Sequence, residues 1–256
     1  DEDKAYLVRA KDVPKLAVGL DMDRLNFLET RQPPIEENNA TVILTMNQES
    51  IYESYISEMA VFALEGINVL AYNNPGKGFS TGSPDRENIN ASIDAAYQYV
   101  KQIKGVDDKD ILAKGQCFGV APTAWLGAQH PEINLMLDQG GSSFHELAMT
   151  VMENKLEDVK DKKPFFAWIG KLLLQNFIIQ GLVKALFSGY TTSEDVKKNK
   201  GRKIINVNVP NVYREGGDEM VAHYHTEKFA DAAAREGGGN VRVSMNPGAY
   251  HVTHWF

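Results

Sequence analysis

Short apolar segments alternate with longer amphipathic segments along most of the chain, and this pattern predicts strands and helices in turn. Each apolar segment is followed by polar or glycine-bearing sequence, which is typical of a buried strand that ends at a loop. The predicted strands are Thr41 to Met46, Ile67 to Tyr72, Ile111 to Lys114, Ile133 to Asp138, Lys203 to Val209 and Val241 to Met245. The predicted helices are Ile51 to Leu64, Arg86 to Ile103, Phe118 to Gln129 and Val221 to Glu236. Gly66, Gly105 and Gly237 follow three of these helices, as expected of a residue that tolerates left-handed backbone.

The repeated order of strand and helix predicts an α/β fold, in which a mostly parallel sheet carries helices on both faces. Two further β-like segments, Ala5 to Val8 and Leu25 to Leu28, predict an antiparallel hairpin at the start. The chain has 256 residues, of which 43% are hydrophobic, and this is enough to bury one sizeable core. We therefore expect a single domain over residues 1–256.

Residues 142–200 interrupt the alternation, because they contain no convincing strand. Their apolar part, residues 165–190, is broken by polar side chains such as Lys171 and Gln180, whereas a membrane-spanning helix needs about 20 nearly uninterrupted apolar residues. We therefore expect a buried or lid helix and no integral membrane segment. An insertion in such a sheet most naturally covers the carboxyl ends of the strands, so the segment predicts a helical cap.

Charge and cysteine content exclude several classes of protein. The net charge is −7 and no basic stripe stands out, so nucleic acid is not an expected partner. A single cysteine excludes a disulfide framework and multi-cysteine metal sites. His223 and His225 diverge on a helix, so no metal or other cofactor is expected. The first residues lack signal-peptide features and do not begin with Met, which indicates a trimmed end. The compartment, cytoplasmic or that of a secreted effector, and the oligomeric state stay open.

The sequence KGQCFG places Cys117 in a G-x-C-x-G pattern between a predicted strand and a predicted helix. A nucleophile on so sharp a turn needs small residues two positions before and after it, and Gly115 and Gly119 supply them. The turn places the sulfur at a helix N-terminus, where free N–H groups favour a thiolate. The backbone N–H of Phe118 then points to where an oxyanion would form. The alternative is an ordinary buried cysteine.

Over nearly its whole length the chain resembles the α/β-hydrolase family. The segment TVILTMNQES resembles the strand that ends in the family's oxyanion loop, which implies that Asn47 or Gln48 provides the second backbone donor. The segment YNNPGKGFSTGSP, residues 72–84, resembles the loop after the next strand in lipase-like and peptidase-like members. A phosphate-binding loop is the alternative for this segment, but the spacing of its glycines does not fit one.

The resemblance also implies two partners for Cys117. The segment PNVYREGGDEMV follows a predicted strand where the family carries its acid, which makes Asp218 the candidate and Glu219 the alternative. The segment PGAYHVTHWF follows the last strand and makes His251 the candidate base, with His254 second. Nucleophile, acid and histidine then occur in the order that this fold requires.

A Cys-His-Asp triad predicts a hydrolase that forms an acyl-enzyme from a small-molecule or lipid ester, or from a thioester. Cysteine at this position is known in the dienelactone-hydrolase branch of the family, whereas its lipases and peptidases use serine. The segments LMLDQGGSSFHELA and YTTSEDVKKNKGRK resemble small-cap hydrolases of lipid or acyl esters, in particular lipase-like, SidB-type effectors of intracellular bacteria. Two alternatives stay open, a non-catalytic scaffold that binds a ligand or protein partner and an acyltransferase.

Overall fold

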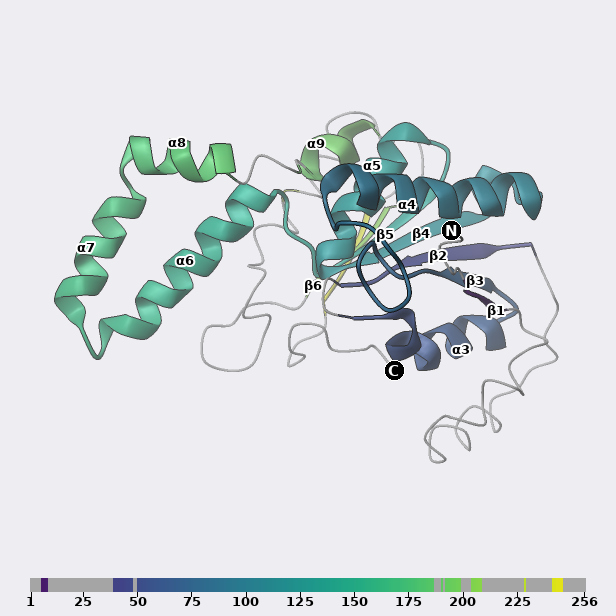
Figure 1. Cartoon of the computed structure of the whole chain (residues 1–256), viewed down its shortest axis with the longest axis horizontal. Helices are drawn as coiled ribbons and strands as arrows, with labels where there is room; N and C mark the ends of the chain where they lie inside the picture. The colour runs from purple at the N-terminus through teal and green to yellow at the C-terminus, as the bar shows by residue number, and fades with distance from the viewer. Residues whose placement is uncertain are drawn as a thin grey trace.

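The computed structural model describes residues 6–8, 39–47, 50–186, 190, 192–198, 204–208, 228 and 241–245. Within these residues, seven strands form one sheet in the order β1-β3-β2-β4-β5-β6-β7 (Figure 1). The strands are β1 (Tyr6–Val8), β2 (Thr41–Thr45), β3 (Asn68–Ala71), β4 (Ile111–Gln116), β5 (Asn134–Asp138), β6 (Ile204–Asn208) and β7 (Val241–Met245). β1 runs antiparallel to β3 and the other pairings are parallel, so β2 to β7 all end at the same edge of the sheet.

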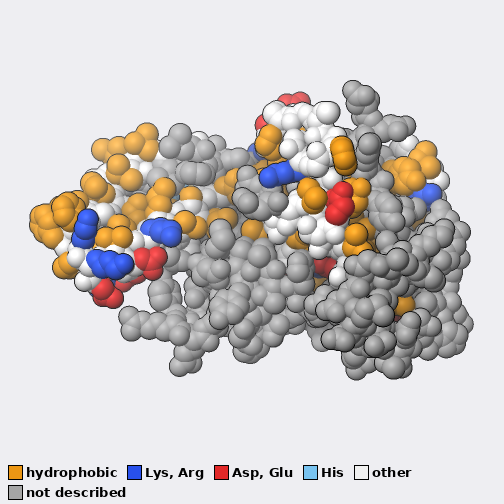
Figure 2. Space-filling view, turned by 60° about the horizontal axis from the view of Figure 1, so that its bottom comes forward, with side chains coloured by type: hydrophobic (Ala, Val, Ile, Leu, Met, Phe, Trp, Pro, Cys, Tyr) orange, Lys and Arg blue, Asp and Glu red, His pale blue; other side chains and the backbone are white. Residues whose placement is uncertain are grey.

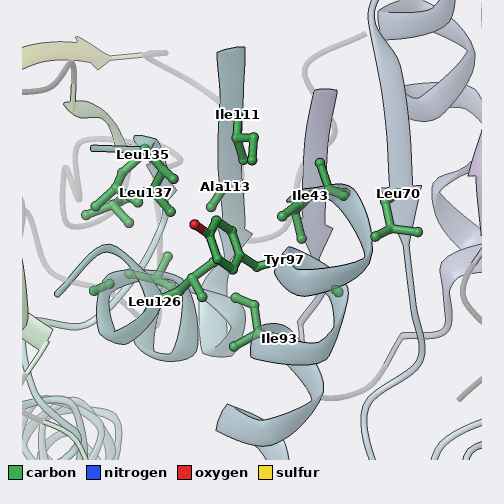
Figure 3. Close-up of a cluster of buried hydrophobic side chains, with 14 of the residues drawn as sticks. Ile43, Leu70, Ile93, Tyr97, Ile111, Ala113, Leu126, Leu135 and Leu137 are labelled. Carbon is green, nitrogen blue, oxygen red and sulfur yellow. The ribbon is translucent and has the colours of Figure 1, made fainter. Parts of the chain in front are cut away.

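Helices cover both faces of the sheet, as the alternation of strand and helix predicts. One face packs against α3 (Ile56–Leu64), and the other packs against α4 (Arg86–Gln98), α5 (Val120–Gln129) and α9 (Thr192–Lys198). Successive strand residues point to opposite faces, so Ile43 joins the core under α4 and α5 while Val42 and Leu44 join the core under α3. Figure 3 shows the larger core, in which Ile93 and Tyr97 of α4 and Leu126 of α5 lie against Ile43, Ile111, Ala113, Leu135 and Leu137 of the strands.

The predicted strands within the described residues are all present, and each end lies within two residues of its predicted position. β4 continues past Lys114 because Gly115 pairs with Thr45 of β2 and Gln116 pairs with Asp138 of β5. The predicted hairpin partner of β1, Leu25 to Leu28, lies outside the described residues. So does the predicted helix Val221 to Glu236, apart from Lys228.

Two helices begin later than predicted, and each has a local reason. A 3₁₀ turn, Tyr52–Tyr55, precedes α3, because the backbone N–H of Tyr52 donates to Asn73 Oδ1 at 2.8 Å and ties this turn to the loop after β3. A second 3₁₀ turn, Cys117–Gly119, precedes α5. The end of α4 also differs, since a π-helical turn at Tyr99–Ile103 follows it.

Within the described residues, the interval between β5 and β6 is helical. It contains α6 (Phe144–Lys160), α7 (Pro164–Leu174), α8 (Phe177–Leu186) and α9. Figure 1 shows α6, α7 and α8 extending away from the sheet, and we call these three helices the arm; α9 returns to pack beside α5. The side chain of Asn176 accepts the backbone N–H of Ile178 at 2.9 Å and so starts α8. None of the helices that the structure describes is long and apolar enough to cross a membrane.

Candidate active site

The turn after β4 holds Cys117 in a backbone conformation that residues other than glycine rarely adopt. Its φ is 51°, in the left-handed region, and its side chain is half-buried. A non-glycine residue in this region costs about 1–3 kcal/mol and persists only where the surrounding structure enforces it. The 3₁₀ turn and α5 follow at once, so the chain forms the strand–turn–helix elbow that presents a nucleophile in many hydrolases.

The two glycines around Cys117 are required by the space at the elbow. A Cβ on Gly115 would lie 2.3 Å from the carbonyl oxygen of Gly119 and 2.5 Å from Thr123 Oγ1. A Cβ on Gly119 would lie 2.3 Å from the carbonyl oxygen of Thr45. All three contacts are shorter than real Cβ atoms make. The predicted reason for this glycine pattern therefore agrees with the geometry, and the elbow lies directly against the end of β2.

Asn47 follows the end of β2 and is buried beside the elbow. Its Nδ2 donates to the hydroxyl of Tyr55 at 3.1 Å, and its Oδ1 accepts the backbone N–H of Ser50 at 2.9 Å. These bonds fix the segment that was expected to supply an oxyanion donor. The other candidate for that donor, Gln48, lies outside the described residues. The assignment of the second donor therefore stays a prediction.

Tyr55 and Gln116 belong to the site, although the sequence pattern did not single them out. The Tyr55 hydroxyl donates to Oε1 of Gln116, the residue immediately before Cys117. Burial raises the pKa of Tyr55 to about 12, with small contributions from Glu58 and Cys117 in the same direction, while hydrogen bonds with Asn47 and Ser50 lower it. The hydroxyl therefore keeps its proton at neutral pH and links the β2 end to the β4 end. The signal in the sequence was the polar Gln116 directly before Cys117, two residues past the predicted end of the strand.

The aromatic side chain of Phe118 lies beside the start of the arm. Its ring centroid lies 5.4 Å from that of Phe144, at the start of α6, and 6.5 Å from that of Tyr190. The Tyr190 hydroxyl donates to Asn90 Oδ1 of α4 at 3.0 Å. The base of the arm therefore borders the elbow, as a cap would, while coverage of the rest of the site by residues 142–200 stays a prediction.

A buried charged cluster lies on the α3 side of β4. Lys114 Nζ forms an ion pair with Glu58 of α3 and lies 3.6 Å from Asp138 Oδ2 at the end of β5. All three side chains are at most 3% exposed. The cluster ties a helix and two strands together below Gln116, and we assign it a structural role.

The proposed acid and base fall outside the described residues, but the strands that precede them do not. Asp218, Glu219, His251 and His254 follow β6 and β7. These strands are parallel to β4, so the loops that leave them start at the edge where Cys117 lies. Three strand spacings of about 4.8 Å separate β4 from β7, a distance that such loops can cross. The topology therefore suits the triad, whose assembly stays a prediction.

The described histidines give no support for a metal site. His130 stacks on Tyr97 with ring centroids 3.9 Å apart, and its Nε2 lies 3.2 Å from Asp94 Oδ1, so its role is structural. No group of three or more His, Cys, Asp or Glu side chains within the described part of the chain is arranged to hold a metal ion. His223 and His225 lie outside it.

Residues 37–126, which run from just before β2 through the elbow into α5, match the family model described as Chlamydia CHLPS protein (DUF818). The chain is 36% identical over 63 residues to Alpha/beta hydrolase domain-containing protein 17C of Mus musculus and 36% identical over 72 residues to Uncharacterized protein F37A4.1 of Caenorhabditis elegans. These matches cover 25% and 28% of this chain. They span only 20% and 15% of the two relatives.

Solved structures extend the likeness to most of the chain. An alpha-beta hydrolase from Vibrio vulnificus superposes with a TM-score of 0.58 at 21% identity, over 81% of this chain and 66% of its own. The Pyrococcus furiosus esterase Pf2001 superposes with a TM-score of 0.60 at 19% identity, over 84% of this chain and 74% of its own. The chain therefore has the α/β-hydrolase fold, as the sequence predicts. The narrower resemblance to SidB-type effectors stays a prediction.

Proposed function

We propose that this protein hydrolyses carboxylic esters or thioesters through an acyl-enzyme formed on Cys117, with His251 as base and Asp218 as the acid that orients it. The observation that carries the proposal is the left-handed backbone of Cys117 between two glycines that cannot accept a Cβ. A cysteine that served only as core packing would have no need of such a turn. Esterases and hydrolases among the structures of the same fold give further support.

The chemistry would follow the usual two steps of acyl transfer. His251 removes the proton from Cys117 Sγ, and the sulfur attacks the carbonyl carbon while the carbonyl electrons move to oxygen. The backbone N–H groups of Phe118 and of Asn47 or Gln48 stabilise that oxyanion. The intermediate expels the alcohol or thiol, which takes its proton from His251. Water, deprotonated by His251, then attacks the carbonyl carbon of the acyl-cysteine; the carbon–sulfur bond breaks, the acid is released, and Sγ takes the proton back from His251.

Intact-mass spectrometry after a short incubation with activated esters and acyl thioesters tests the nucleophile. We expect one acyl adduct, mapped to Cys117 by peptide digestion, and turnover that is lost in Cys117→Ala. Cys117→Ser keeps a nucleophilic oxygen at the elbow and should retain measurable ester hydrolysis, because serine is the usual residue of this motif. Absence of an adduct, together with a thiol that alkylates only after unfolding, would support the binding scaffold instead.

The base can be tested with the same readout. His251→Ala should abolish acylation, while His254→Ala should leave most of it. His130→Ala is the matched control, since His130 packs on Tyr97 away from the elbow. The reverse ranking of the first two variants would transfer the role to His254. Addition of an alcohol acceptor separates a hydrolase from an acyltransferase, because only the latter would form mainly the new ester.

A further inference from the structure

Large hydrophobic side chains are exposed mainly on the arm. Of the ten such side chains in the described part of the chain, seven lie on α7 and α8, and we call these seven the arm face. They are Phe165, Phe166, Trp168, Leu172 and Leu173 on α7 and Ile178 and Leu182 on α8. Figure 2 shows hydrophobic side chains gathered over the arm, with Lys side chains between them. An exposed apolar patch of this kind marks an interaction site.

The packing of α7 on α6 explains why the aromatic side chains point outward. Ala167 is buried, and a Cβ on Gly170 would lie 2.5 Å from a methyl group of Leu156 on α6. Small residues therefore form the contact between the two helices. The opposite side of α7 carries Trp168, which is 61% exposed, and Phe165, whose ring stacks on it at 6.2 Å. Of the two expectations for this segment, a buried helix or a lid helix, the first does not hold for α7, because its large apolar side chains are exposed.

The segment that contains α7 and α8 carries a charge opposite in sign to that of the rest of the chain. Residues 162–186 contain four Lys and no Asp, Glu or Arg, which gives a charge of +4. The whole chain carries −7, so the remainder carries −11 (−7 − 4). The acidic side chains of the arm belong to α6 and the turn after it, and one of them, Glu157, lies 3.1 Å from Lys160 and 3.8 Å from Lys171. The arm face is therefore apolar with basic flanks.

We propose that the arm face docks on the surface of an anionic lipid bilayer. Aromatic and aliphatic side chains would enter the boundary between headgroups and acyl chains, while Lys162, Lys163 and Lys171 would contact the phosphates. A second copy fits this face less well, because it would bring two segments of +4 together. A bilayer rich in acidic lipids neutralises the same charge. The proposal does not depend on the chemistry of Cys117.

Vesicle sedimentation provides the test, with vesicles of phosphatidylcholine alone and with about 30% phosphatidylserine. We expect the full chain to bind the acidic vesicles and to bind neutral ones at least about tenfold more weakly. The double variant Phe165→Ser with Trp168→Ser, and separately Lys162→Glu with Lys163→Glu, should each lower binding to acidic vesicles by about tenfold or more. These side chains are exposed, so circular dichroism should show an unchanged fold.

Matched controls lie away from the arm. Ile103→Ser removes an apolar side chain that is 70% exposed after α4, and Lys109→Glu reverses an exposed charge before β4. Both should bind acidic vesicles as the unmodified chain does, and so should Cys117→Ala, which separates docking from catalysis. Tryptophan emission should shift to shorter wavelength on binding, and Trp168→Phe should remove that shift while it keeps binding.

Three results would overturn the proposal. The first is no binding to acidic vesicles. The second is binding that the arm variants do not reduce more than the controls do. The third is a dimer in sedimentation velocity that buries Trp168 in the absence of lipid and is lost in the arm variants, which would assign the arm face to a second copy.

Discussion

Gly119→Ala tests the geometry of the elbow more directly than any change at Cys117. The added methyl group would lie 2.3 Å from the carbonyl oxygen of Thr45 and 2.8 Å from that of Met46. Ordinary contact begins at 3.4 Å, so the elbow and the end of β2 must separate by about 1.1 Å (3.4 − 2.3). Both obstacles are backbone atoms, which cannot rotate away. Overpacking of this kind costs about 1–3 kcal/mol, and we expect the free energy of unfolding to fall by that amount.

The same displacement moves the nucleophile relative to the proposed oxyanion donors. A misplacement of about 1 Å can lower a rate about 100-fold, so single-turnover acylation of Cys117 should slow to that extent. Urea unfolding measures the stability, and intact-mass spectrometry at timed intervals measures the acylation. The two readouts are independent, since a variant that is merely unstable would still acylate at the normal rate while it is folded.

Gly181→Ala is the matched control for Gly119→Ala. Gly181 lies in α8, and a Cβ there would meet nothing within 4 Å. Alanine is the better helix former by about 1 kcal/mol, so this variant should be as stable as the unmodified chain or more so, with unchanged acylation. If Gly119→Ala matched Gly181→Ala in both measurements, the close approach of the elbow to β2 would be refuted.

Three further predictions concern buried side chains around the elbow. Tyr55→Phe removes the hydroxyl that joins two buried amides and should cost about 1–3 kcal/mol of stability in urea unfolding, with slower acylation. Stability should fall as the pH rises from 10 to about 12, because tyrosine ionises near 10.0 in the unfolded chain, while the pKa values of Tyr55 and Tyr190 are about 12 in the fold; a flat profile would contradict this. Lys114→Met should cost about 3–5 kcal/mol, since it leaves Glu58 and Asp138 buried without their shared cation, and an unfolding midpoint equal to that of the unmodified chain would show that the cluster is not buried.

Local patterns carried most of what the sequence predicts correctly. The strands were found because buried parallel strands are short apolar runs, and the elbow was found because its strain and close approach demand glycine at Gly115 and Gly119. The sequence did not predict the contacts between polar residues that are far apart along the chain. Lys114 was expected to end a strand, whereas it is buried in β4 because Glu58, from another layer, pairs with it. Tyr55 likewise meets Gln116 across 61 positions of sequence, and no local pattern reports such a pair.

For the arm, the sequence predicted a helix but not the exposure of its apolar side chains. A run of apolar residues predicts a helix with an apolar face, but not what covers that face. Trp168 could have packed on the domain or on another helix by the same pattern, and its exposure depends on where α7 projects. The acid and base were predicted from resemblance, and their residues lie outside the part of the chain that the structure describes.

The strand order also has a consequence for synthesis on the ribosome. β1 to β5 lie within residues 6–138 and are neighbours in the sheet. β6 and β7, from residues 204–245, extend the sheet beside β5. Domains begin to fold while their N-terminal part emerges first. A nascent chain can therefore hold β4 between both of its neighbours, with Cys117 already placed at the turn that follows it, before the arm is made. His251 follows β7 in the sequence, so on the proposed mechanism the growing chain cannot form the acyl-enzyme until the segment after β7 has been translated.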